Sequence, residues 1–341
     1  MKLRDYIIRR LLLAIPVVIG VLAITFVLSY MVGDPITLYT TERTPIEAIP
    51  GIRAEHGLNQ PLYIQFFFYL RDLMMGNWGY SRSARMDVTA TIAQRFPATI
   101  ELAMVALVFA VIAGIPLGIL SATKKDRVPD HVTRVVALAG VSMPIFWFAL
   151  ILKYLFFYQF YVWGLPFLPE GGRYSYEYVS YTPITNFMLL DSILTLNPVL
   201  FFDTAIHLIL PGFALGYLTL AIITRMMRSS MLEVLKEDYI TLARSKGLRD
   251  RVVIYKHALR NAMIPTVTVI GLAFGGLMTG AVLTETIFSW PGLGRWSVRA
   301  ILQSDIPSIN AFTLLVAFIF VAANLVVDLI YGTLDPRIRY G

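Results

Sequence analysis

The sequence predicts an all-α fold that crosses a membrane six times, with both chain ends in the cytoplasm. Three observations lead to this prediction. Hydrophobic residues make up 57% of the chain and charged residues only 15%, whereas soluble domains carry about a quarter charged residues. The apolar residues form runs of about 20 residues, the length that lets a helix cross the hydrocarbon core of a bilayer. Lysine and arginine residues gather in alternate connections between these runs.

The six apolar runs define the predicted spans. The first run follows Lys2, Arg4, Arg9 and Arg10 and is too long for the apolar region of a signal peptide. We therefore expect it to be retained as an anchor helix. Several runs contain proline, which neighbouring helices can accommodate in a membrane bundle. The predicted spans are residues 9–32, 97–121, 134–160, 205–225, 262–287 and 308–332.

The distribution of basic residues orients these spans. Nineteen lysine and arginine residues lie on the side of the chain ends and nine on the opposite side, most of the nine in residues 33–96. Cytoplasmic loops carry such an excess, so both ends and the loop between the fourth and fifth spans are predicted to face the cytoplasm. The net charge of +7 is thereby attributed to topology and not to a groove for nucleic acid.

We divide the chain into three parts. Residues 1–32 are the anchor helix, residues 33–96 an extracytoplasmic region, and residues 97–341 a core domain of five spans that contains a cytoplasmic loop at 226–262. An interfacial helix is predicted at 61–75. The outward segment 161–204 is long and rich in tyrosine, at Tyr174, Tyr176, Tyr178 and Tyr181. These rings either stack on sugar rings, contact a protein partner outside the membrane, or serve as ordinary interfacial aromatics.

Several kinds of chemistry are excluded by composition. The chain has no cysteine, which excludes disulfides and thiolate sites. Its four histidines are scattered without ligand spacing, so we expect neither a metal site nor a membrane-embedded active site. The 341 residues contain no Gly-x4-Gly-Lys-Ser/Thr loop for a nucleotide phosphate. The sequence therefore predicts a chain that is not an enzyme and binds no cofactor itself.

The loop between the fourth and fifth spans carries the most specific pattern. Residues 231–246 contain good helix formers throughout, so we predict one helix there. Gly247 follows and can adopt the left-handed conformation that ends a helix. A second helix is predicted from near Arg249 toward the membrane. Such a projecting helix–turn–helix suits docking against a soluble partner, although an ordinary basic inside loop is the alternative.

This loop resembles the EAA loop of ABC importer permeases, especially its form in the dipeptide/oligopeptide permease family. Thr241 and Leu242 replace the eponymous Glu-Ala pair, as is usual in that branch. Other resembling segments are residues 6–12, 33–35, 57–62, 95–102 and 285–294, followed by Ala300 and Asp305. The matching loop residues are Asp238, Tyr239, Ala243, Arg244, Lys246, Gly247, His257, Ala258, Leu259, Arg260, Asn261, Ile264 and Pro265.

The resemblance implies a type I ABC importer permease fold in the cytoplasmic membrane. It also implies four kinds of partner: a second homologous permease subunit, two cytoplasmic ATPase subunits that bind ATP and Mg²⁺, an extracellular solute-binding protein, and lipid. Nucleic acid is not expected. The residues that would couple the chain to the ATPases are Glu237, Asp238, Tyr239, Ala243, Arg244, Lys246, Gly247, Leu248, His257, Arg260 and Asn261.

Three further groups of residues are candidates for function. Pro291, Gly292, Gly294 and Arg295 form either an outer gate or a plain tight turn. In the fifth span, glycines at four-residue spacing favour close helix packing, within the subunit or against a partner; they are Gly271, Gly275, Gly276 and Gly280. Charged residues within spans usually face protein or water, and Lys153, Glu101 and Asp328 are of this kind. Glu101 is expected to bond between helices.

Two alternatives remain open from the sequence. A secondary transporter driven by an ion gradient would also be polytopic, but it predicts half-repeats and buried coupling carboxylates, which the chain does not clearly show. If the chain is an importer subunit, the cargo is a peptide, an oligosaccharide or a nickel chelate, because relatives of the resembling family carry all three. The segment 161–204 departs most from that family and leaves the cargo open.

Overall fold

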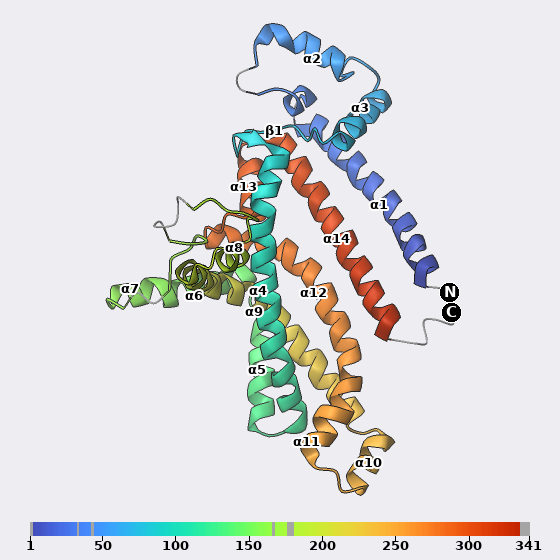
Figure 1. The fold of residues 1–341 in the computed structure, drawn as a ribbon, viewed down its shortest axis with the longest axis vertical. Helices are drawn as coiled ribbons and strands as arrows, with labels where there is room; N and C mark the ends of the chain where they lie inside the picture. The colour runs from blue at the N-terminus through green and yellow to red at the C-terminus, as the bar shows by residue number, and fades with distance from the viewer. Residues whose placement is uncertain (1–2, 33, 42–43, 166–167, 176–180, 335–341) are drawn as a thin grey trace.

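The computed structural model describes residues 3–32, 34–41, 44–165, 168–175 and 181–334. Within them the structure is almost entirely helical, and one short hairpin pairs β1 (Tyr80–Ser81) with β2 (Met86–Asp87). The long helices run side by side along one direction, as Figure 1 shows. The membrane-length helices are α1 (Leu3–Val32), α4 (Val88–Thr123), α9 (Pro198–Val234), α12 (Leu259–Ile287) and α14 (Ile306–Leu334).

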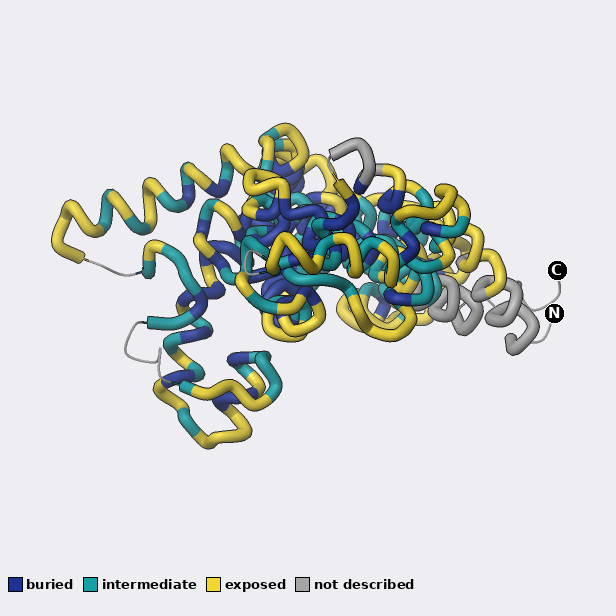
Figure 2. Tube along the Cα trace, turned by 90° about the horizontal axis from the view of Figure 1, so that it is seen from above, coloured by how far each residue is buried: buried dark blue, intermediate teal, exposed yellow. Residues whose placement is uncertain are grey.

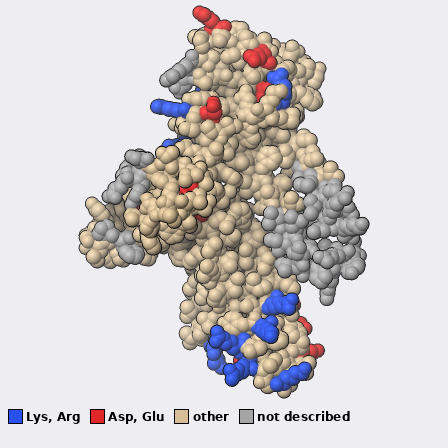
Figure 3. All heavy atoms as spheres, viewed as in Figure 1, with Lys and Arg blue, Asp and Glu red and all other residues tan. Residues whose placement is uncertain are grey.

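Hydropathy and length confirm a polytopic membrane protein. Five helical segments of the described chain are long and apolar enough to span a bilayer, and α1 adds a shorter apolar stretch at Ile15–Val27. The start of α1 and the end of α14 both point toward the end of the molecule that carries α10 (Asp238–Ser245) and α11 (Asp250–Val252) (Figure 1). Basic side chains gather at that same end in Figure 3. This arrangement matches the orientation predicted from the loop charges.

The third predicted span is wrong as a single straight helix over 134–160. The structure has α5 (Val128–Ser142), a break, and then α6 (Ile145–Lys153), which continues through a π-helical turn at Tyr154–Gln159 into α7 (Phe160–Val162). Pro144 causes the break because proline disfavours a helical conformation at the preceding residue, and Met143 is extended with φ −89° and ψ 129°. In Figure 1, α5 runs along the bundle whereas α6 and α7 run across it.

The centre of the bundle is the pair α4 and α9. Small residues make their close approach possible: Gly114 and Gly118 of α4 meet Ile223 and Met227 of α9. Gly216 of α9 lies so close to α4 that a β-carbon there would be 2.6 Å from the carbonyl oxygen of Ala106. Small residues at four-residue spacing allow this kind of packing in lipid. Buried residues therefore concentrate in the middle of the bundle, as Figure 2 shows.

The outer region is a cap of short helices. The predicted interfacial helix at 61–75 is confirmed as α3 (Leu62–Met74), preceded by α2 (Ile49–Glu55) and two 3-10 turns at Pro35–Leu38 and Ile46–Ala48. The hairpin is tied to the start of α14 because Ser81 Oγ and Ser83 N donate to Asp305 Oδ2 at 3.0 and 2.9 Å. Near the C-terminal end of α1, Ser29 Oγ accepts a hydrogen bond from Asn310 Nδ2 of α14 at 2.6 Å.

The basic end of the bundle is held by a buried carboxylate in the first turn of α5. Asp130 is fully buried and accepts from Arg228 of α9 through Nε and Nη2, both at 2.8 Å. Ser121 of α4 and the backbone N–H of Asp126 also donate to it. The hydrogen bonds from Arg228 hold the pKa of Asp130 well below its ordinary value of 3.8, although burial acts in the opposite direction. One side chain thus joins α4, α5 and α9.

Acid should weaken this junction. Because the pKa of Asp130 is lower in the folded chain than in the unfolded one, its contribution is complete above pH 3.8 and is lost as the pH falls below that value toward the folded pKa. The detergent-solubilised wild-type protein should therefore lose more thermal stability between pH 6 and about pH 3 than the Asp130→Asn variant loses over the same range. Equal losses in the two proteins would contradict the assignment.

The α4–α9 contact predicts a matched pair of glycine variants. Gly216→Ala should destabilise the protein by about 1–3 kcal/mol, because the added methyl group forces two backbones apart. Gly276→Ala in α12 should be neutral or slightly stabilising, since nothing lies within 4 Å of its β-carbon position. Denaturation of the purified subunit compares the two, and equal stability would contradict the packing.

Candidate functional site

The cytoplasmic loop forms a projecting helix–turn–helix, which we call the knob and define as residues 235–258. The prediction of a single helix over 231–246 is wrong, because α9 ends at Val234 and α10 begins only at Asp238. Between them Glu237 is extended, with φ −66° and ψ 147°. Acidic side chains are favourable at a helix start, so the Glu237-Asp238 pair is the sequence signal that marks this break. Figure 1 shows the knob beyond the ends of the long helices.

Gly247 ends α10 as the sequence predicted. Its φ is +74°, in the left-handed region. Its N–H donates to the carbonyl of Arg244 at 2.9 Å, and the N–H of Leu248 reaches the carbonyl of Ala243 at 3.4 Å. This pair of bonds is the Schellman pattern that closes a helix at a left-handed residue. Arg249 then caps α11, which confirms the predicted start of the return helix.

One face of α10 is anchored in the bundle. Ile240 is fully buried and Ala243 is 7% exposed, in a cluster that includes Ile119 of α4 and Met227 and Met231 of α9. The same cluster contains Val253 and Ala258 of the π-helical segment Val253–Ala258 and Ala262 of α12. The knob is therefore packed against three membrane helices at once. A displacement of α10 is transmitted to all three because packed interiors resist compression.

One polar contact fixes α10 to the membrane helix that follows the knob. Asn261 Nδ2 donates to the hydroxyl of Tyr239 at 2.6 Å, which joins the start of α10 to the start of α12. Arg244 lies 4.0 Å from Asp250, but both side chains are mostly exposed, so this ion pair contributes little. His257 is half-buried in the π-helical segment, and Arg260 is exposed.

The opposite face of the knob exposes apolar side chains to solvent; we call it the docking face. Its members are Tyr239, Leu242, Leu248, Val252 and Tyr255, which are 37–56% exposed. Exposed apolar side chains gathered on a soluble projection are typical of a contact site. Glu237, Asp238 and Lys246 are exposed beside it. Leu242, Val252 and Tyr255 were not among the coupling residues named from the sequence; the departure at Leu242 from the Glu-Ala pattern was the available signal.

At the outer end, the Pro291–Gly294 segment is a turn built around Glu285. The Glu285 carboxylate accepts from the backbone N–H of Arg295 at 2.9 Å and from Thr99 Oγ1 of α4 at 2.6 Å. A β-carbon at Gly292 would overlap this carboxylate, and one at Gly294 would lie 2.5 Å from the Val282 Cα. The turn thus starts α13 (Leu293–Leu302) against α4 and α12.

Two sequence segments noted for their family resemblance meet at this turn. Besides the Thr99–Glu285 bond, Trp290 Nε1 donates to the carbonyl of Ala98 at 2.8 Å. Burial lowers the pKa of Arg295, and the positive charge of Arg299 lowers it further. Residues 95–102 and 285–294 therefore form one packed unit with a basic rim.

The outward segment 161–204 is fastened to the bundle by charged groups. Arg173 donates to Glu101 through Nε at 2.9 Å and Nη2 at 2.6 Å, and the N–H of Leu189 in α8 (Met188–Leu194) donates to the same carboxylate at 2.8 Å. Glu101 thus bonds both to a loop and to a helix. Lys153 lies close to the same segment, donating to the Ile287 carbonyl at 3.2 Å and lying 3.4 Å from Glu170. The Glu101 carboxylate and the Lys153 ammonium group therefore both have partners within the protein.

These contacts frame an outer cavity of about 620 Å³. It is lined by Glu170–Ser175, His207 of α9 and Ser289, Pro291 and Arg295 at the turn. Tyr174 lines this cavity, and the hydroxyl of Tyr181 is buried without a partner among the described residues. Tyr176 and Tyr178 lie outside the described residues, as does the side chain of Asp328.

The glycines of α12 divide between two environments. A β-carbon at Gly275 would lie 3.6 Å from Ala323 of α14, and one at Gly280 would lie 3.5 Å from Leu215 of α9, so both glycines pack within the subunit. Gly276 faces open space, and Gly271 is half-buried. The close approach of α4 and α9 depends instead on Gly114, Gly118, Gly212 and Gly216, which the sequence analysis did not single out.

Comparisons with known proteins agree with this architecture. Residues 114–340 match the family described as binding-protein-dependent transport system inner membrane component, and residues 3–103 match its N-terminal counterpart. The chain belongs to this family. It is 46% identical to the dipeptide transport system permease protein DppB of Escherichia coli (strain K12), over 98% of this chain and 99% of the relative.

Two further relatives span the chain equally well. The di/tripeptide transport system permease protein DppB of Pseudomonas aeruginosa is 45% identical, and the glutathione transport system permease protein GsiC of Escherichia coli O1:K1 is 36% identical. Each alignment covers 98% of this chain and 99% of the relative. As an inner membrane component of such a transport system, the chain is a multi-pass protein of the cytoplasmic membrane. The family consists of transport components, in agreement with a non-catalytic subunit.

The two faces of α10 predict opposite responses to truncation. Ile240→Ala should destabilise the seating of α10 by about 2–5 kcal/mol, because it leaves a cavity among buried side chains. Leu242→Ala should not, since Leu242 is 55% exposed. Limited trypsin digestion at Lys246 measures this local opening, and equal digestion of the two variants would contradict the assignment of faces.

Proposed function

We propose that this chain is one permease subunit of an ATP-driven importer for short peptides. One observation carries the proposal: an exposed apolar docking face lies on a helix whose other face is buried against three spans. Such an element suits the transfer of motion from a soluble partner into the membrane. The 341 residues contain no phosphate-binding loop, so ATP and Mg²⁺ would be bound by the partner.

The assembly we propose contains four kinds of component besides lipid. Two cytoplasmic ATPase subunits would dock on knobs of this chain and of a second, homologous permease subunit, which completes the pathway. An extracellular solute-binding protein would deliver cargo near the outer turn and the outer cavity. Closure of the ATPases would move α10, and the buried cluster would tilt α4, α9 and α12 as packed bodies.

The cargo follows from the relatives named above. Two of them are named for dipeptides or di- and tripeptides and one for glutathione, itself a short peptide, and the chain aligns with each over nearly its whole length. We therefore propose that the cargo is a short peptide; none of these three relatives is named for an oligosaccharide. Uptake into proteoliposomes containing the whole assembly tests this: a dipeptide should compete with labelled cargo, and competition by an oligosaccharide alone would contradict it.

The coupling role predicts the effect of three substitutions in the knob. Leu242→Asp and Asp238→Arg should weaken ATPase docking by about 2 kcal/mol or more each, roughly a 30-fold loss of affinity, if these residues lie at the centre of the contact. Gly247→Val should act similarly, because a branched side chain strains a residue held at φ +74°. The subunit should still insert and fold in all three variants.

The measurement is co-purification of the ATPase subunits, together with cargo-stimulated ATP hydrolysis and uptake in proteoliposomes. Thr268→Val, a change at a half-buried position of α12 outside the knob, serves as the control and should leave coupling intact. Normal co-purification and stimulated hydrolysis in all three of these knob variants would overturn the coupling role. Transport by the chain alone, driven by an ion gradient, would overturn the importer proposal itself.

A further inference from the structure

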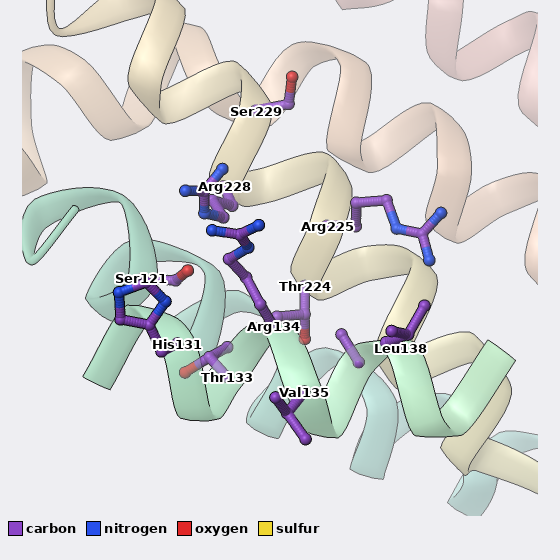
Figure 4. Close-up of a pocket in the computed structure, with 11 residues that line it drawn as sticks. Ser121, His131, Thr133, Arg134, Val135, Leu138, Thr224, Arg225, Arg228 and Ser229 are labelled. Carbon is purple, nitrogen blue, oxygen red and sulfur yellow. The ribbon is translucent and has the colours of Figure 1, made fainter. Parts of the chain in front are cut away.

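A basic hollow of about 540 Å³ lies between α5 and α9 at the cytoplasmic end of the bundle. It is separate from the docking face. Arg134 of α5 and Arg225 and Arg228 of α9 line it, with Thr224, Ser229 and the apolar side chains of Val135 and Leu138. Figure 4 shows the side chains of Arg134 and Arg228 converging from the two helices.

The charges around the hollow do not balance. Asp130 is the acidic neighbour, and both of its oxygens are engaged by Arg228. Within the described part of the chain, neither Arg134 nor Arg225 has a carboxylate within 4.0 Å, and both side chains are exposed. Two guanidinium groups therefore face the hollow without an internal counterion. Guanidinium is well suited to phosphate because its planar donors match two oxygens of that group.

A second observation points independently to a bound ligand. Thr224 is 2% exposed and lines the hollow, yet its hydroxyl has no hydrogen-bond partner in the described structure. An unsatisfied buried hydroxyl is costly, and such groups usually have a partner. The hydroxyl oxygen is itself enclosed, so a rotation of the Thr224 side chain would bring it to the hollow, where a phosphate oxygen would accept from it while the arginines bind the remaining oxygens.

The surroundings of the hollow indicate what carries the phosphate. α5 exposes a row of apolar side chains next to the basic residues: Val128, Val132, Val135 and Leu138 are 56–73% exposed. The hollow is lined by residues of α5 and α9 toward the end of the bundle where Lys and Arg side chains gather (Figure 3), which we take as the level of the cytoplasmic headgroups. A headgroup-sized basic pocket beside an exposed apolar helix face matches an amphiphile and not a free ion.

We propose that this hollow binds the phosphate headgroup of an anionic phospholipid of the cytoplasmic leaflet. Arg134 and Arg225 neutralise the phosphate, Thr224 donates to it, and the acyl chains lie along the valine and leucine face of α5. Arg228 stays paired with Asp130 and shapes the hollow. The inference concerns lipid and stands whether or not the proposed cargo is correct.

Native mass spectrometry of the purified full-length chain tests the site, with phosphatidylglycerol, phosphatidylcholine and inorganic phosphate as probes. Arg134→Gln/Arg225→Gln should weaken phosphatidylglycerol binding by roughly 25-fold, about fivefold for each basic residue lost near the surface. The control Lys124→Gln/Arg127→Gln removes two charges from the same end but outside the hollow, and should change binding by less than about threefold. The two double variants should have the same melting temperature in phosphatidylcholine.

Thr224→Val provides a test that leaves the charge unchanged. If the hydroxyl donates to a bound headgroup, this variant should bind phosphatidylglycerol several-fold less tightly than the wild type. If Thr224 is only an unsatisfied buried group, the variant should bind equally well, and that result would count against the proposal.

Three other results would overturn the proposal. Equal losses in the two double variants would mean that the basic end attracts lipid without a site. Displacement of the lipid by millimolar inorganic phosphate would assign the hollow to a free anion. Loss of the bound lipid on co-expression with the second permease subunit would assign it to an interface between subunits.

Discussion

The close approach of α4 and α9 is the constraint on which the rest of the structure depends. Lipid offers no hydrophobic drive for helix association, so the contact must come from packing at short range. Glycines at 114, 118, 212 and 216 provide it by letting each helix meet the backbone or the first side-chain atoms of the other. The hollow, the knob and the outer turn are all built on the surfaces or ends of this pair.

The cytoplasmic end shows how the α4–α9 pair supports α10. Met227 and Met231 of α9 bury Ile240, so the position of α10 follows the position of α9. The Schellman turn at Gly247 fixes where the return helix begins, and the Tyr239–Asn261 bond closes the knob onto α12. A force applied to the docking face therefore reaches the spans through close-packed side chains and a hydrogen bond, with no flexible linker between.

Sequence reasoning succeeded where one residue type decides the conformation. Gly247, the interfacial helix and the six apolar segments follow from turn chemistry and periodicity. It failed at the third span, where Pro144 was accepted as a tolerated kink although it separates two helices of different direction. It also missed the Glu101–Arg173 pair and the Asp130–Arg228 pair, because their partners are 72 and 98 residues apart and local pattern carries no sign of such contacts.

The basic residues of the cytoplasmic end are commonly explained by topology alone, but their positions in this fold show a division of labour. Arg228 is paired with Asp130, whereas Arg134 and Arg225 line the hollow without such a partner among the described residues. Arg228 and Met231 lie within one turn of the same helix, so the side of α9 that borders the hollow and the side that buries α10 belong to one rigid segment. A headgroup held by Arg134 and Arg225 would therefore resist the same displacement of α9 that a docked ATPase would drive.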